Sequence, residues 1–173
     1  MAGRDREDDF ATFVSTYSPG LLRSAWMLTG DDGRAEDLLQ SSLSKAWRRW
    51  SQVTNASSPE AYVRRILYTT YVSWWRRRWH GELPSARLPE QVYEADLTTL
   101  ISRREAVRAA LGRLTRQQRA IVTLRYLEDL SVAETAAILN CSVGTVKVQS
   151  ARAMAALRRD PRLSTYSPTG VDS

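Results

Sequence analysis

A short helical segment, a three-residue turn and a longer helical segment follow one another between residues 130 and 152. Ser131 and Glu134 have the spacing of a capping box, which starts a short helix. Residues 140–142 form the turn and end in a serine that can cap a helix over 143–158. This order is typical of a helix-turn-helix, the alternative being a plain helical hairpin with a solvated charged face.

The rest of the chain also shows helical periodicity, and no segment alternates as a strand does. Apolar residues between 35 and 50 recur at three- and four-residue spacing, which predicts a helix with one buried face. We expect an all-α fold of two small helical domains joined by a flexible linker. The expected boundaries are an N-terminal domain over 8–83, a linker over 84–102, a C-terminal domain over 103–160 and a disordered tail over 161–173.

Local signals place the helices inside these domains. The first should run from Asp8 to Leu28, with a kink or interruption at Pro19 and a stop at Gly30. The further expected segments are a helix from Asp31 or Asp32 to Trp50, a loop from Trp50 to Ser58, a helix from Ser58-Pro59-Glu60 into the Arg76–Arg78 run, and helices over 103–114 and 115–127.

Composition excludes several classes of protein. The formal net charge of +6 favours an anionic partner such as nucleic acid, and five arginines without an acid lie between residues 62 and 79. The single cysteine excludes an intramolecular disulfide. The sequence has no membrane-spanning run, signal peptide, catalytic cluster, phosphate-binding glycine loop or metal-ligand spacing, so we expect a cytoplasmic protein without cofactor, metal, membrane insertion or enzymatic activity.

Two segments carry chemistry suited to nucleic acid. Small residues at the start of the helix over 143–158 let its free N–H groups approach a phosphate. On that helix Thr145, Lys147, Gln149 and Ser150 are expected to face the major groove. The segment 62–79 interleaves arginines with tyrosines and tryptophans, which neutralise phosphates and stack on unpaired bases. The alternative for this segment is that its rings are core residues and its arginines solvated.

Three motifs of this sequence resemble those of a known family. Residues 36–47 (EDLLQSSLSKAW) are similar to a signature of bacterial extracytoplasmic-function sigma factors, in the sigma-70 family. Residues 131–152 resemble the region 4 helix-turn-helix of that group, and residues 62–82 resemble region 2.4, most of all in the actinobacterial sigma-E-like subfamily. The resemblance covers roughly residues 8–160.

The resemblance implies partners and site residues. It implies an alternative sigma factor that binds core RNA polymerase, recognises −35 and −10 promoter elements and promotes melting, with an anti-sigma factor as a further partner. The implied core-polymerase contacts are Asp37, Gln40, Ser41 and Ser44. The implied −10 contacts are Asn55, Arg64, Arg65, Tyr68, Thr69, Ser73, Trp74, Arg76, Arg77 and Arg78. The implied −35 contacts are Ser142, Gly144, Thr145, Lys147, Val148, Gln149, Ser150 and Arg152.

Other readings make different predictions. A conventional helix-turn-helix regulator would bind a palindromic duplex tightly without docking on core polymerase. A basic amphipathic protein would instead lie on a membrane surface. The polar side chains at Asp37 and Gln40 separate the first reading from the sigma factor, because only a sigma factor uses them to bind polymerase.

Overall fold

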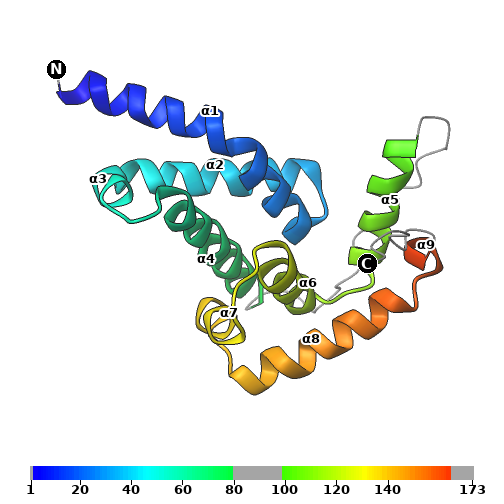
Figure 1. Cartoon of the computed structure of the whole chain (residues 1–173). Coiled ribbons are helices and arrows are strands. Elements are labelled where there is room, and N and C mark those ends of the chain that lie inside the picture. The colour runs from blue at the N-terminus through cyan, green and yellow to red at the C-terminus, as the bar shows by residue number, and fades with distance from the viewer. Residues whose placement is uncertain (1, 80–98, 165–173) are drawn as a thin grey trace, which may run out of the picture. The chain divides into compact units, whose positions relative to one another are not determined.

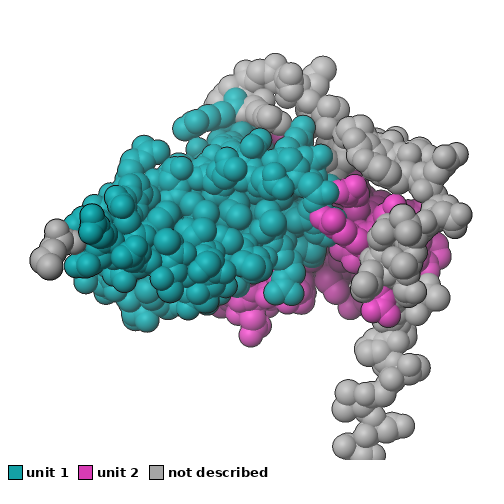
Figure 2. Space-filling view, turned by 90° about the horizontal axis from the view of Figure 1, so that it is seen from above, with its two compact units in different colours: residues 1–84, 138–140 teal, residues 85–137, 141–173 magenta. Residues whose placement is uncertain are grey.

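The computed structural model describes residues 2–79 and 99–164, and these residues form helices (Figure 1). The chain divides into two compact units, one of residues 1–84 with 138–140 and one of residues 85–137 with 141–173 (Figure 2). The expected linker over 84–102 lies outside the described residues up to 98, and its last four residues are helical.

Within residues 2–79 the first unit forms four helices: α1 (Ala2–Thr29), α2 (Asp32–Arg48), α3 (Trp50–Thr54) and α4 (Pro59–Trp79). Helix α2 packs against both α1 and α4 (Figure 1). The fully buried side chains of this unit include Leu21, Leu28, Leu38, Val53, Val63 and Leu67. Burial of such side chains supplies the main stabilising term of a small helical domain.

The junction between α1 and α2 follows the sequence signals. Gly30 has φ 66°, and its N–H donates to the carbonyl of Trp26 at 2.7 Å, which ends α1 in a left-handed residue. Asp31 then accepts from the backbone N–H of Arg34 at 2.8 Å and caps α2. Both predictions for this junction are confirmed.

Helix α1 differs from the expectation at its start, and of the two outcomes expected at Pro19 only the interruption is absent. It begins at Ala2 rather than Asp8, because the Arg6 guanidinium donates to the Trp47 carbonyl at 2.6 Å and stacks on the Trp47 ring. It also continues through Pro19 without interruption. Pro19 is exposed, so water can reach the carbonyl that the proline leaves unpaired. The helix changes direction part-way along its length (Figure 1).

Helices α3 and α4 complete this unit. Residues 50–54 are helical, so the expected loop over 50–58 is wrong for its first half. The Val53 side chain is fully buried, which holds this short helix on the core. Helix α4 begins as predicted, with the Ser58 hydroxyl accepting from the N–H of Ala61 at 3.2 Å and Pro59 in the first turn.

The second unit contains α5 (Thr99–Gly112), α6 (Arg116–Val122), a π-helical turn η1 (Thr123–Leu127), α8 (Val143–Arg158) and α9 (Pro161–Ser164), together with α7 (Val132–Leu139) as far as residue 137. The segment 115–127, expected to be one regular helix, changes to the wider π geometry in its last turn. There the N–H of Glu128 donates to the carbonyl of Thr123 at 3.0 Å. The buried side chains include Leu114, Ile121, Leu124, Val146 and Ala153.

Residues 161–164 are ordered in a helical turn, contrary to the expected tail over 161–173. The reason is Asp160, whose side chain is 1% exposed. One of its carboxylate oxygens accepts from the backbone N–H of Arg162 at 2.9 Å, and the other lies 3.6 Å from the Arg113 guanidinium. A buried carboxylate requires such partners, and they attach α9 to α5. Residues 165–173 lie outside the described residues.

Candidate nucleic-acid and polymerase interfaces

The turn between α7 and α8 has the geometry that the sequence predicts. Ser131 and Glu134 form both bonds of a capping box, at 2.8 and 3.1 Å. The Ser131 backbone N–H, and after it the Ser131 hydroxyl, lower the pKa of the Glu134 carboxyl, because they stabilise its charged form. Asn140 has φ 52°, and the N–H of Cys141 donates back to the carbonyl of Ala136 at 3.1 Å. A left-handed residue therefore closes α7 immediately before α8 begins.

Helix α8 starts at a side-chain cap. The Ser142 hydroxyl accepts from the backbone N–H of Thr145 at 3.0 Å and lies 2.8 Å from the Thr145 hydroxyl. Val146 and Ala153 are fully buried, as expected for residues that hold the helix on the domain. The remaining N–H groups of the first turn of α8, at the positive end of the helix dipole, are therefore accessible to a partner.

The exposed face of α8 differs from the face expected from residue chemistry. Gln149 accepts from the Gln118 amide at 3.1 Å, and the Ser150 hydroxyl lies 3.2 Å from the Tyr126 hydroxyl, so both serve contacts within the unit. Apart from Val143 and Arg158 at its two ends, the exposed residues of α8 follow a helical stripe at spacings of three and four. This stripe, here called the α8 stripe, consists of Gly144, Lys147, Val148, Ala151 and Arg152. Val148 is 49% exposed although it is apolar.

Sequence reasoning missed Ala151, Gln118 and Tyr126. Ala151 could have been found from its spacing, because it lies three residues beyond Val148 on the same helical face. Gln118 and Tyr126 carry no local signal, since their partners on α8 are 31 and 24 residues away in the chain.

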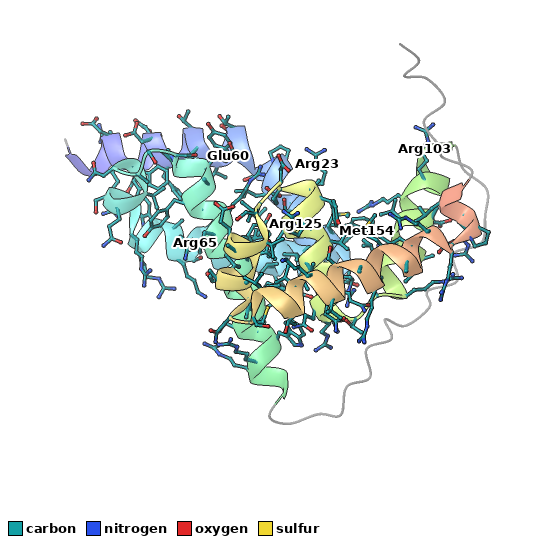
Figure 3. The ribbon with its side chains drawn as sticks, turned by 60° about the horizontal axis from the view of Figure 1, so that its bottom comes forward. Arg23, Glu60, Arg65, Arg103, Arg125 and Met154 are labelled. Carbon is teal, nitrogen blue, oxygen red and sulfur yellow. The ribbon has the colours of Figure 1, made fainter. Side chains whose placement is uncertain are left out.

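Helix α4 separates its predicted residues into exposed and buried groups. Arg65, Thr69, Ser73 and Arg76 follow one helical stripe that is exposed or half-buried, here called the α4 stripe. Arg65 projects from α4 (Figure 3). Tyr68 is 2% exposed, and Arg64 pairs with Glu60 at 2.6 Å one turn away.

The other predicted residues of this set have mixed positions. Trp74 is half-buried, whereas Arg77 is exposed. Asn55 is exposed at the C-terminal cap of α3. The side chain of Arg78 lies outside the described residues. The structure thus brings Arg65, Thr69, Ser73 and Arg76 together on one side of α4 and places Asn55 at the end of another helix.

Helix α2 carries a third polar face. Asp37, Gln40 and Ser44 are exposed and Ser41 is half-buried, at spacings that place all four on one side of the helix. The opposite side holds the buried Ala35, Leu38, Ser42 and Ala46. The side chains of Asp37 and Gln40 form no hydrogen bond with another described residue, so this face is not required by the fold.

Comparison with known proteins identifies the family to which this chain belongs. Residues 13–81 match the family model for Sigma-70 region 2, and residues 104–157 match that for Sigma-70, region 4. The chain is 39% identical over 152 residues to the RNA polymerase sigma-E factor of Streptomyces coelicolor, which covers 88% of this chain and 85% of that protein. The chain belongs to the extracytoplasmic-function sigma factors.

A further relative and one solved structure support the same family assignment, and a second solved structure shares the fold. The sigma factor SigM of Mycobacterium tuberculosis is 34% identical over 152 residues, covering 88% of this chain and 75% of that one. Among solved structures, the sigma factor RpoE in complex with the anti-sigma factor NepR from Bartonella quintana matches with a TM-score of 0.63 and 25% identity, over 92% of this chain and 99% of that one. CnrH in complex with the cytosolic domain of CnrY has the same fold, with a TM-score of 0.56 and 20% identity.

Family membership decides between the readings of the sequence. The chain is an alternative sigma factor that acts with RNA polymerase at promoter DNA. Sigma factors are non-enzymatic transcription initiation factors. Among the described helices, none combines the length and the apolar character that crossing a membrane requires.

Proposed function

We propose that this sigma factor uses three separate polar surfaces for three tasks. The α8 stripe reads the −35 element, the α4 stripe with its neighbours captures the −10 element, and the polar face of α2 binds core RNA polymerase. The observation that carries this proposal is that each surface lies opposite a buried face of the same helix. Its residues are therefore available to a partner without cost to the core.

On α8, the first turn approaches the DNA backbone and the α8 stripe enters the major groove. Lys147 and Arg152 supply positive charge at successive turns, and each can donate to a phosphate or to guanine acceptors. Val148 and Ala151 lie between them and offer apolar contact, which suits the methyl group of thymine. Ser142 and Thr145 hold the end of the helix, while Gln149 and Ser150 fix its position on the domain.

On α4, Arg65 and Arg76 supply charge for phosphates, and Thr69 and Ser73 supply hydroxyl groups between them. Trp74 and Asn55 are proposed to contact the unpaired strand, since a ring face can stack on any base. The proposed contacts of Trp74 and Asn55 exist only when the strands are separated, and they therefore favour opening of the duplex. We assign Tyr68 and Arg64 to packing and to the Glu60 pair, in view of their burial and partner.

An anti-sigma factor is a further proposed partner of this chain. The support is that RpoE of Bartonella quintana, which has this fold at 25% identity, forms a complex with the anti-sigma factor NepR. Because bacterial RNA polymerase works in the cytoplasm, we propose that compartment for the chain.

Transcription by reconstituted polymerase tests the proposal. The purified chain is added to core RNA polymerase on genomic DNA fragments, and transcript starts are mapped. Discrete new starts that share a −35/−10 pair are expected. Asp37→Arg should remove these starts, whereas the matched charge change Asp9→Arg, at an exposed position of α1, should keep them. If the chain binds a palindromic duplex alone and directs no starts, it is a conventional helix-turn-helix regulator instead.

A further inference from the structure

The side chain of Gln118 connects the start of α6 to α8. Its Oε1 atom accepts from the backbone N–H of Thr115 at 3.1 Å, which is one bond of the capping box that begins α6. Its Nε2 atom donates to Oε1 of Gln149 on α8 at 3.1 Å. One amide therefore caps one helix and contacts the next. We refer to the series from Thr115 N–H through Gln118 to Gln149 as the α6–α8 hydrogen-bond chain.

The direction of this chain is fixed by the group at its start. A backbone N–H only donates, so the atom of Gln118 that meets Thr115 must be its oxygen. The amide nitrogen of Gln118 then lies toward α8, where it must donate to the oxygen of Gln149. If either glutamine turned its amide over, two donors would face each other. Both amides are consequently held in one orientation.

The orientation of Gln149 leaves its nitrogen for a partner. Gln149 is half-buried and follows Val148 of the α8 stripe directly. Among the hydrogen bonds of the described residues, none uses Nε2 of Gln149. The hydroxyl of the next residue, Ser150, lies 3.2 Å from the Tyr126 hydroxyl, which holds this flank of α8 on the same unit. Both the position and the polarity of the Gln149 amide are thus set within the unit.

We propose that the α6–α8 hydrogen-bond chain makes Gln149 a fixed hydrogen-bond donor toward a base of the −35 element, and that Gln118 is a positioning residue for base specificity. The proposal rests on the proposed function of α8. In the major groove guanine O6 and N7 and thymine O4 accept hydrogen bonds, whereas the amino groups of cytosine and adenine donate them. A glutamine usually reads adenine with both ends of its amide, but the oxygen of Gln149 is already bonded to Gln118. Its N–H groups therefore favour an acceptor and disfavour an amino group.

The substitution Gln118→Glu should reverse this polarity. A carboxylate keeps the capping box, since it also accepts from the N–H of Thr115. Its second oxygen can only accept, so Gln149 must turn over and place its own oxygen toward the DNA. At one base pair of the −35 element, the preference should change from a base with an acceptor to a base with an amino group. The expected change in relative affinity is roughly 5- to 150-fold.

The matched control is Gln117→Glu. This residue is the neighbour of Gln118 on α6, it is also half-buried, and the substitution adds the same negative charge. Binding is measured with the holoenzyme on duplexes in which each base pair of the mapped −35 element is replaced in turn. The control should weaken all duplexes by a common factor and keep the order of the wild type. A further variant, Gln149→Ala, should remove the preference at the affected base pair without reversing it.

The proposal is overturned if Gln118→Glu, folded as judged by circular dichroism, ranks the duplexes as the wild type does. A uniform loss larger than that of the control would also overturn it, because Gln149 would then contact a phosphate. If Gln118→Glu does not fold, an unchanged ranking by Gln149→Ala overturns it equally.

Lys147→Ala on the same duplexes separates this proposal from the proposed function. If Lys147→Ala weakens binding while the Gln118 and Gln149 variants keep the wild-type order, α8 binds the −35 element and only the role of the chain is wrong. If Lys147→Ala binds every duplex as the wild type does, the proposed function of α8 fails and this proposal fails with it.

Discussion

Gly144 should be dispensable for folding and necessary for binding DNA. It lies in the first turn of α8, and a methyl group added there would meet the Ser142 hydroxyl at 3.8 Å, an ordinary contact. Alanine is favoured over glycine in helices by roughly 0.5–1 kcal/mol. For a unit of this size Gly144→Ala should therefore raise the thermal midpoint by about 2–8 °C.

The same methyl group should weaken binding of the −35 element. We propose that a phosphate approaches the N–H groups of the first turn, and a side chain at position 144 would keep it away. A hydrogen bond to a charged group contributes roughly 1.5–3 kcal/mol, so its loss corresponds to about 10- to 100-fold in affinity. Stability and affinity should thus change in opposite directions.

The assay measures both quantities on the same preparations. Thermal unfolding is followed by circular dichroism, and affinity is measured with the reconstituted holoenzyme on a duplex that carries the mapped −35 element. Gly112→Ala is the matched control, because a methyl group there meets nothing within 4 Å and the next residue, Arg113, contacts Asp160 beyond the C-terminal end of α8, at the opposite end from Gly144. If Gly144→Ala binds DNA as tightly as Gly112→Ala, the first turn of α8 does not approach the backbone and the reasoning is refuted.

Three further predictions concern single side chains. Lys147→Ala should lower the salt slope of −35 binding by about 0.9, so that the wild type's advantage shrinks roughly threefold between about 50 and 200 mM salt; an unchanged slope would exclude a phosphate contact. Asp37→Arg should abolish binding to core RNA polymerase without changing the melting temperature of the chain. If the variant still binds, the polar face of α2 is not the polymerase-binding surface. Because folding lowers the pKa of Glu134 below its ordinary value of 4.5, the ionised carboxylate stabilises the folded unit at pH values above 4.5. This stabilisation is lost as the pH falls from 4.5 through the lowered pKa. Glu134→Gln should therefore unfold with a weaker pH dependence in acid, and an equal dependence would contradict this.

Local signals predicted most helix ends correctly, because a cap is a short-range interaction. Ser131 with Glu134, the serine before α8 and the pair Gly30–Asp31 act on backbone groups within five residues of themselves. Helix α8 runs from Val143 to Arg158, as its cap and its periodicity indicate. Apolar spacing likewise gave the buried side of α2.

Helix ends that depend on distant partners were not predictable in this way. The start of α1 is set by Arg6 and Trp47, which lie 41 residues apart. The turn over 161–164 depends on the burial of Asp160 and on Arg113. Each local sequence looks polar and unstructured, since the stabilising group belongs to another helix.

The same division applies to the binding surfaces. Short motifs and periodicity were enough to predict a helical chain with a helix-turn-helix that resembles extracytoplasmic-function sigma factors, because these properties are encoded over a few neighbouring residues. Tertiary structure decided which side chains of each helix stay available to a partner. Gln149 lies against Gln118, Tyr68 is buried, and the Lys45 ammonium of α2 donates to the Thr70 hydroxyl of α4. Exposure depends on which helices pack together, and that packing is a property of the whole unit.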